Sequence, residues 1–271
     1  MANVAYLNLG TSWFGHPAME LPRREVVVAD RRLTHEPSFI RKVSRVFWES
    51  LRFALPTIPL LVALGWFVLM QRFSADASWM WMAFLIAPAL TLAALIAECL
   101  FVLGLKWMLL GRVRAGQHPL WSCWCSRWDF LYVAWQFYAI GPLASLQGTL
   151  LLNMFLRATG AKIGRRVVLG PGFSQLVDPD MLNIADGATV NANFQAHSFE
   201  DRVLKLAPVH VRRNATIGEN SVVFYGADIG EETWVAPNGV VMKNEMLPAK
   251  LEFAGCPVQP VEQSAAHHLK A

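Results

Sequence analysis

The sequence predicts an α + β protein, in which a helical membrane hairpin and interfacial helices are followed by a left-handed parallel β-helix of hexapeptide repeats. Three observations predict this class. Aliphatic residues recur every six positions late in the chain, and two apolar runs of about twenty residues lie in its first half. The composition is 54% hydrophobic and only 16% charged, which is typical of proteins with a membrane part.

The six-residue period is the strongest of these signals. It fits neither an α-helix nor an ordinary strand, and it is typical of a coil that turns a corner every six residues. A run of short antiparallel strands would not keep one period for so long. The inward positions that this period predicts are Val211, Ile217, Val223, Ile229, Val235 and Val241, with the same spacing earlier at Ile163 and Leu169, then at Ile184, Val190 and Ala196.

Two apolar runs predict a helical hairpin. The first covers residues 51–71, and the second begins at Trp79 and continues to Leu110. Each is long enough to cross a bilayer core of roughly 30 Å as a helix, and the short polar link 72–78 suits a tight connection. The alternative is a pair of buried core helices in a soluble protein.

The basic residues indicate an orientation for this hairpin. Arg41, Lys42 and Arg45 precede the first run, and Lys106 and other basic residues lie at the end of the second. The link carries only one basic residue, so the positive-inside rule predicts that both ends of the hairpin lie in the cytoplasm. We therefore expect a multi-pass protein of the inner or plasma membrane with its β-helix facing the cytoplasm.

The segment 111–158 is rich in tryptophan and is apolar again after Phe130. It could form a third span, a re-entrant segment or helices at the membrane interface. Polar residues and the Gly141-Pro142 pair make it a poor span, so we expect interfacial helices. The sequence thus predicts six consecutive parts. These are the tail of a preceding β-helix (1–22), a basic cytoplasmic linker (23–50), a transmembrane hairpin (51–110), aromatic-rich interfacial helices (111–158), a β-helix (159–250) and a C-terminal tail (251–271).

Cysteines and charge point to neither a metal site nor nucleic acid. Cys123 and Cys125 form a C-x-C pair without a second pair, so we expect free thiols and no metal ligands. The net charge is only +4, and the basic residues flank the apolar runs. We expect these residues to contact membrane lipid rather than nucleic acid.

Candidate catalytic residues lie where the six-residue period breaks, between Gln195 and Val209. We expect a loop there, with His197 at its first turn as a general base and Glu200 or Asp201 orienting its ring. The alternative is an exposed loop histidine without a role. Two further residues are expected to shape the acyl pocket, Asn193 and Arg202.

The repeats resemble those of hexapeptide-repeat acyltransferases. The apolar hairpin, then Gly160–Gly164, then the Ala196–Arg202 segment (AHSFEDR), together resemble the C-terminal region of single-module nonribosomal peptide synthetases of the ε-poly-lysine synthetase type. The resemblance implies that His197 is catalytic. It also implies an acyl donor that is a phosphopantetheine thioester on a carrier domain, with coenzyme A as the alternative and no cofactor in this chain.

The same resemblance implies partners. These are adenylation and carrier domains and sister β-helix repeats of a parent chain, arranged as a trimer or pseudo-trimer of β-helices. A shared pattern supports a tandem arrangement, because residues 13–18 (WFGHPA) parallel residues 253–258 (FAGCPV). Two functions remain open: an acyltransferase domain that joins an aminoacyl thioester to an amine, and a catalytically inactive membrane scaffold repeat that completes a neighbouring β-helix site.

Overall fold

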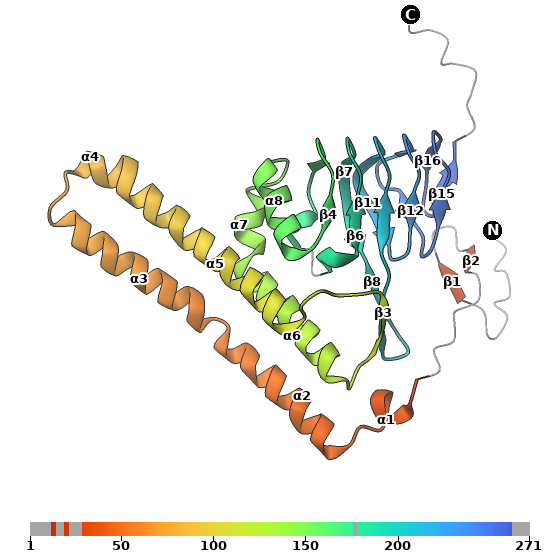
Figure 1. Ribbon diagram of the computed structural model, residues 1–271, viewed down its shortest axis with the longest axis horizontal. Coiled ribbons are helices and arrows are strands. Elements are labelled where there is room, and N and C mark those ends of the chain that lie inside the picture. The colour runs from red at the N-terminus through yellow and green to blue at the C-terminus, as the bar shows by residue number, and fades with distance from the viewer. Residues whose placement is uncertain (1–11, 15–18, 22–28, 176–177, 262–271) are drawn as a thin grey trace, which may run out of the picture.

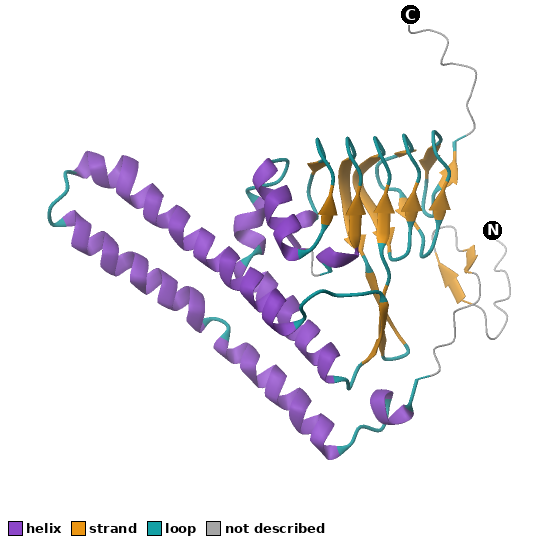
Figure 2. Ribbon diagram, viewed as in Figure 1, coloured by secondary structure: helices purple, strands orange, loops and turns teal. Residues whose placement is uncertain are grey.

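The computed structural model describes residues 12–14, 19–21, 29–175 and 178–261. Helices dominate the chain from residue 31 to residue 159, and strands dominate from residue 162 onward (Figures 1 and 2). The α + β class with helices first and a sheet region last is therefore confirmed. The two regions meet along α6 (Cys123–Tyr138), which lies between the long helices and the sheets (Figure 1).

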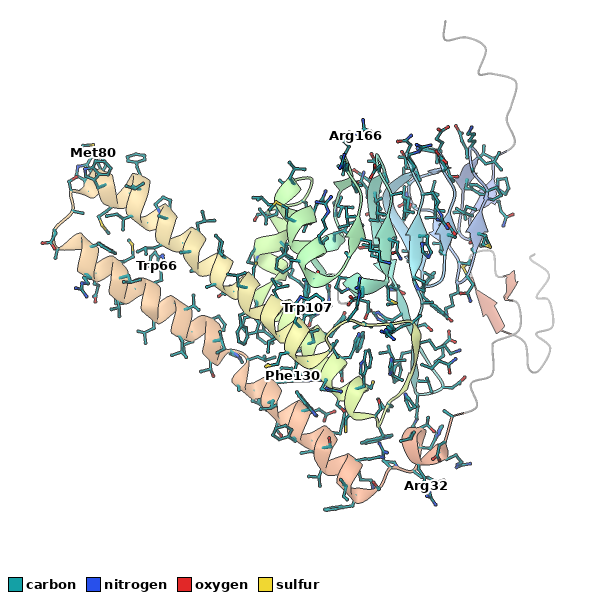
Figure 3. All side chains as sticks on the ribbon, in the orientation of Figure 1. Arg32, Trp66, Met80, Trp107, Phe130 and Arg166 are labelled. Atoms are coloured by element: carbon teal, nitrogen blue, oxygen red, sulfur yellow. The ribbon has the colours of Figure 1, made fainter. Side chains whose placement is uncertain are left out.

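A long helical hairpin projects from the sheet region (Figure 1). One arm is α2, η1 and α3, and the other is a nearly continuous helix made of α4, η2 and α5. Trp66 on the first arm faces the second, where its Nε1 donates to Thr91 Oγ1 at 3.2 Å (Figure 3). The bounds are α1 (Arg31–Thr34), α2 (Phe39–Leu51), η1 (Arg52–Ala54), α3 (Thr57–Ser74), α4 (Trp79–Trp81), η2 (Met82–Ile86) and α5 (Ala87–Leu109).

Both arms are long and apolar enough to cross a membrane. The helical stretches are Arg31–Ser74 and Trp79–Leu109, with mean hydropathies of 2.1 and 2.3 over their most apolar windows. Only 6% of each window is buried against protein. A core helix of a soluble protein would be mostly buried, so the hairpin does not match the alternative of two core helices.

The first helix after the hairpin, α6, packs within the protein, while the expectation of interfacial helices over residues 111–158 stays a prediction. Trp135 and Tyr138 of α6 are fully buried, because α5 and α2 cover one side of the helix and the sheet region covers the other. Asp129 of α6 binds Arg45 at 2.5 Å and Arg52 at 2.7 Å, which ties α6 to the first arm. Two shorter helices, α7 (Ile140–Ala144) and α8 (Leu150–Thr159), follow at the first turn of the sheet region.

The sheet region is a stack of parallel strands whose register advances by eighteen residues per turn from residue 209 onward, after two longer turns of 21 and 27 residues. His210 pairs with Asp228, which pairs with Met246, and on a second side Thr216 pairs with Trp234, which pairs with Glu252. A third side pairs Val222 with Val240. The strands are β4 (Lys162–Ile163), β5 (Val168–Leu169), β6 (Leu182–Ile184), β7 (Thr189–Gln195), β10 (Val209–Val211), β11 (Thr216–Phe224), β12 (Asp228–Ile229), β13 (Trp234–Val235), β14 (Val240–Val241), β15 (Met246–Leu247) and β16 (Glu252–Ala254).

The predicted inward positions form the core of this stack. Ile217 on the second side lies in register with Val235, and Val223 on the third side lies in register with Val241. Each of them is fully buried, and burial of such a side chain contributes roughly 1.5–3 kcal/mol. The six positions of the unbroken run are at most 1% exposed: Val211, Ile217, Val223, Ile229, Val235 and Val241.

The corners of the stack depend on residues with positive φ. Asn214, Glu232 and Lys250 follow one another at intervals of eighteen, with φ of 54°, 57° and 61°. This left-handed conformation bends the chain sharply from one side of the stack to the next, and asparagine tolerates it better than most residues. At another corner Gly226 has φ of 76°, and a Cβ there would lie 1.9 Å from Asn244 Oδ1, so only glycine fits.

The two similar sequence segments form hairpins of the same register. β1 (Ser12–Phe14) pairs with β2 (Met19–Leu21), with Trp13 opposite Glu20. β16 pairs with β17 (Gln259–Pro260), with Phe253 opposite Pro260. Residues 15–18 and 22–28 lie outside the described part of the chain, so the assignment of residues 1–22 to a preceding β-helix stays a prediction.

We predict that substitutions at inward and outward positions of the stack differ sharply in their effect on the free energy of unfolding. Ile217→Ala should lower the free energy of unfolding by about 2–5 kcal/mol, since it removes buried methyl groups and leaves a cavity. Val168→Ala should change it by no more than about 0.5 kcal/mol, because Val168 is 46% exposed. Thermal unfolding of both variants in one detergent measures the difference, and equal destabilisation would contradict the inward assignment.

Candidate active site

The break in the six-residue period forms a β-hairpin rather than the loop expected. β8 (His197–Glu200) pairs antiparallel with β9 (Val203–Leu206), and Asp201 and Arg202 form the turn, both with positive φ. β9 also pairs with β3 (Gly116–Pro119), which comes from the segment before α6. The three strands therefore fix the insert to the helical region.

His197 stands at the base of this hairpin and contacts a buried carboxylate. Its Nδ1 lies 2.6 Å from Oδ2 of Asp178, a residue that directly precedes the short helix η4 (Pro179–Met181). The Asp178 side chain is 3% exposed and that of His197 is 28% exposed. The carboxylate is thus shielded from water while the imidazole remains accessible.

Trp128 of α6 completes the arrangement. Its Nε1 donates to Asp178 Oδ1 at 2.7 Å, and its ring stands edge-on to the imidazole of His197, with centroids 4.9 Å apart. The two carboxylate oxygens therefore each have a donor. A carboxylate on Nδ1 favours the tautomer in which Nδ1 carries the hydrogen, and this leaves Nε2 with a free lone pair. Such a ring is able to act as a general base.

The expectation that Glu200 or Asp201 orients His197 is wrong on geometry. Glu200 is three residues from His197 along a strand, so its side chain lies on the opposite face, where it binds Lys205 and Lys243. Asp201 lies at the hairpin turn, about 13 Å along the strand from His197. The carboxylate in contact with His197 is that of Asp178, which sequence analysis missed because it lies nineteen residues earlier in the chain.

A cavity of about 380 Å³ opens beside His197, between α6 and the third side of the stack. Asn193 lines it, as expected, together with Tyr132 of α6 and Gln175 of η3 (Phe173–Gln175), whose Nε2 donates to the Tyr132 hydroxyl at 2.9 Å. Arg202 does not line this cavity. Its side chain lies at the hairpin turn, with Nη1 3.4 Å from the carbonyl oxygen of Thr34.

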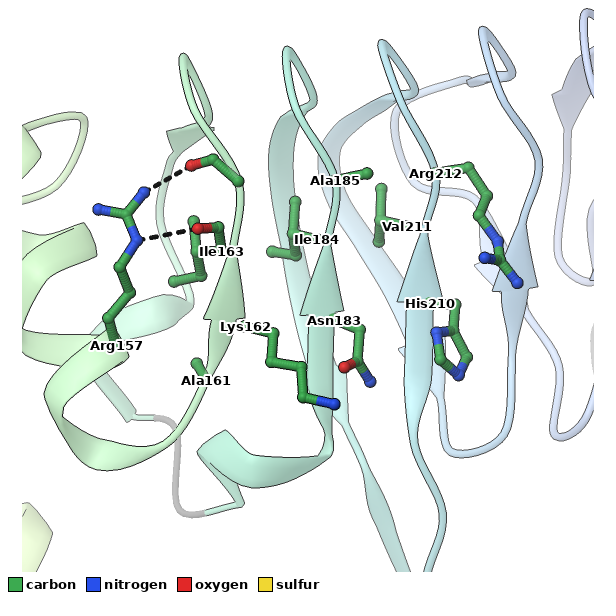
Figure 4. A pocket seen from close by; sticks show the side chains of 11 residues that line it. Arg157, Ala161, Lys162, Ile163, Asn183, Ile184, Ala185, His210, Val211 and Arg212 are labelled. Atoms are coloured by element: carbon green, nitrogen blue, oxygen red, sulfur yellow. Dashed lines mark hydrogen bonds between the residues drawn. The ribbon is translucent and has the colours of Figure 1, made fainter.

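A second, more open cavity of about 600 Å³ lies on the first side of the stack (Figure 4). Lys162, Asn183 and His210 stand in a row on successive strands, and Arg157 donates to the carbonyl oxygens of Ile163 and Gly164 (Figure 4). No hydrogen bond joins the His210 ring to a carboxylate within residues 29–175 and 178–261. This cavity therefore lacks the oriented base found at His197.

None of the four cysteines, which all lie within the described residues, forms a disulfide. Cys123 is exposed at the start of α6, and Cys125, two residues further along the helix, is buried. Burial raises the pKa of the Cys125 thiol to about 11. A thiol in that environment stays protonated at neutral pH and is a poor nucleophile, so the C-x-C pair adds nothing to the chemistry of the cavity.

No protein-family model matches the chain. The chain is 31% identical, over 258 residues, to delta-poly-L-ornithine synthetase of Acinetobacter baumannii (strain AB307-0294). The alignment covers 93% of this chain but only 19% of the relative. The relative confirms the resemblance to poly-amino-acid synthetases that the sequence indicates, and this chain corresponds to one part of such a synthetase.

Solved structures with some likeness are acetyltransferases. A hexapeptide-repeat containing acetyltransferase from Vibrio cholerae, solved with acetyl coenzyme A, has a TM-score of 0.32 at 17% identity, with 66% of this chain and 89% of that chain covered. Serine acetyltransferase from Brucella abortus strain S19, solved with coenzyme A, has a TM-score of 0.28 at 14% identity, with 85% and 78% covered.

The bond from Trp128 to Asp178 predicts a measurable loss of stability. Trp128→Phe keeps an aromatic ring beside His197 but leaves a buried carboxylate oxygen without its donor, which should cost about 1–3 kcal/mol. The matched control is Trp124→Phe on the same helix, since the indole N–H of Trp124 makes no hydrogen bond within the described ranges. Thermal unfolding measures both variants, and an equal loss in the control would contradict the prediction.

Proposed function

We propose that this chain is a membrane-anchored acyltransferase-like domain of a nonribosomal peptide synthetase, which joins an aminoacyl thioester to an amine. The observation that carries the proposal is the pair of Asp178 and His197 beside a cavity of substrate size. The poly-ornithine synthetase relative supports a peptide-forming role, although this chain spans only 19% of it. The activity, substrates and partners of a whole synthetase are therefore part of the proposal.

In the proposed reaction His197 acts as the general base. The amine nitrogen attacks the thioester carbonyl carbon, and its proton passes to Nε2 of His197. The C–N bond forms, the C–S bond breaks, and the proton then passes from Nε2 to the departing sulfur, which gives an amide and a free thiol. Asp178 keeps the ring in the required tautomer and stabilises the imidazolium that forms.

Other cavity residues serve binding rather than proton transfer. Asn193 lines the cavity with an amide group, which is able to donate to the acyl carbonyl oxygen or accept from the amine. Tyr132 offers a hydroxyl from the facing helix. Arg202 and Asp201 are not included, since both belong to the hairpin turn.

The proposal includes the hand of the stack, which is left-handed. Its support is the strict period of six with three sides per turn and one inward aliphatic residue on each side, which is typical of hexapeptide repeats. The acyl donor is a phosphopantetheine thioester on a carrier domain, with coenzyme A as the alternative donor. Adenylation and carrier domains and sister β-helix repeats are the proposed partners.

The proposal also places α3 and α5 across the inner or plasma membrane, with the β-helix in the cytoplasm. Support comes from the exposed apolar surface of both arms and from the basic residues at the open end of the hairpin. Arg45 and Arg52 lie at that end, and both bind Asp129 of α6. The tip of the hairpin, at Asp76, then faces the other side of the membrane.

The catalytic role of His197 is tested with a surrogate reaction. The full chain in detergent is given an ornithyl N-acetylcysteamine thioester and free ornithine, a choice suggested by the name of the relative. His197→Ala should lower the rate of amide formation by about 10²–10⁴-fold, since general-base help is lost. The matched control is His210→Ala, which should keep the rate because His210 lies on another side of the stack.

Amide formation by His197→Ala at the unaltered rate would contradict the catalytic role. Absence of amide formation by the unaltered chain would leave the alternative function standing, an inactive scaffold repeat that completes a neighbouring β-helix site. A chain without activity alone, but with activity when a sister repeat is added, would also favour that alternative.

The orientation of the hairpin is tested by cysteine labelling in intact cells. In a variant with Cys123→Ser and Cys256→Ser, a membrane-impermeant maleimide should label Ser78→Cys at the hairpin tip. Glu232→Cys, at an exposed corner of the stack, should be labelled only after the membrane is permeabilised. Labelling of both positions from the same side would contradict the orientation.

A further inference from the structure

A buried ion pair joins the end of α5 to the segment that carries Asp178. Lys106, near the last turn of α5, is fully buried, and its Nζ lies 2.7 Å from Oδ2 of Asp180, whose side chain is 2% exposed. Nζ also donates to the carbonyl oxygen of Gly111 at 2.9 Å. The ammonium and the carboxylate are both shielded from water, in contrast to the surface ion pairs of the stack.

Asp180 and Asp178 belong to one tight turn. Pro179 stands between them and restricts the backbone, and the amide of Met181 donates to the carbonyl oxygen of Asp178 at 3.0 Å. Two residues on such a turn move together. A displacement of the Asp180 carboxylate therefore displaces the Asp178 carboxylate that contacts His197.

Asp180 is also confined from the side of α8. Gly160 caps that helix with φ of +118°, and a Cβ at Gly160 would lie 2.3 Å from Asp180 Oδ1 and 2.8 Å from its Cγ. The carboxylate thus occupies the space that any other residue at position 160 would fill. Asp180 is held between α5 and α8, on the side of η4 away from the hairpin insert.

Stability alone is a poor explanation for this pair. The burial of two charges carries a large desolvation penalty, and well-packed apolar residues of similar size often stabilise a protein as much or more. A buried ion pair does, however, fix one geometry, because a charge that moved away from its counter-charge would be left buried and uncompensated. The geometry that this pair fixes is the position of η4 against α5.

We propose that Lys106 and Asp180 are positioning residues, which hold η4 so that the carboxylate of Asp178 meets Nδ1 of His197. The inference rests on the proposed function, and it makes the docking of α5 on the sheet region a condition for a correctly oriented His197. Neither residue touches the cavity beside His197. Their effect on the reaction passes through Asp178.

The test replaces the pair by apolar residues of similar size, as Lys106→Met with Asp180→Leu, so that no unpaired charge is left buried. The full chain is purified in detergent with ¹⁵N-labelled histidine, and His197→Ala assigns the signal of His197. In the unaltered chain the ¹⁵N shifts should report hydrogen on Nδ1. In the double variant that tautomer should no longer dominate, although the fold measured by thermal unfolding is kept.

The same variant separates positioning from binding in the surrogate reaction. Its kcat should fall about 10- to 100-fold with KM unchanged, because the base is misplaced while the cavity is intact. The control is the exposed pair Arg213 and Glu231, changed as Arg213→Met with Glu231→Leu, which should leave both the tautomer and kcat as they are. An unaltered tautomer and kcat in the Lys106 and Asp180 double variant would overturn the proposal.

A second variant is needed in case the double variant does not fold. Asp180→Asn keeps the volume and a hydrogen-bond acceptor for Lys106, and the same loss of tautomer and kcat is expected. Loss of the fold in both variants would overturn the proposal, since the pair would then be required for folding itself. The ¹⁵N measurement of the His197 tautomer does not depend on activity. Amide formation by His197→Ala would therefore contradict the proposed function, while the tautomer would still test whether Lys106 and Asp180 position Asp178.

Discussion

A single buried carboxylate, that of Asp178, connects the three parts of the molecule that meet at the candidate site. One oxygen accepts from Trp128 of α6, and the other contacts His197 at the base of the hairpin insert. Two residues later on the same turn, Asp180 binds Lys106 of α5. A buried carboxylate is costly unless each of its oxygens has a donor. The position of this one therefore requires the helices, the turn and the insert to be in place together.

The same dependence explains which parts of the structure could be predicted from the sequence. The inward set from Val211 to Val241 follows from a local period, because each turn repeats the environment of the one before it. The place of the insert follows from the same period, since nine extra residues separate the partners Asn183 and His210 beyond the eighteen of a regular turn. The carboxylate that contacts His197 could not be found this way, because His197 and Asp178 are brought together by long-range packing.

The incorrect choice of Glu200 and Asp201 has the same physical origin. Proximity in sequence suggests contact only where the chain folds back within a few residues, as a loop does. The insert is extended, so side chains alternate between faces and Glu200 turns away from His197. The second strand, Val203–Leu206, is buried at all four positions. Its pairing with β3 was not visible in the sequence, since that strand lies more than eighty residues earlier.

The cavity beside His197 bears on how such domains assemble. Under the proposed function, sister β-helix repeats of a parent chain are partners, so it matters which walls of the cavity this chain supplies by itself. Here Tyr132 of α6 supplies a wall opposite Asn193, within the same chain. The helix that provides this wall is buried between the stack and the apolar hairpin, and Trp128 on it holds Asp178. The groups that orient His197 therefore all belong to this one chain, and the proposed sister repeat is not needed to position the base.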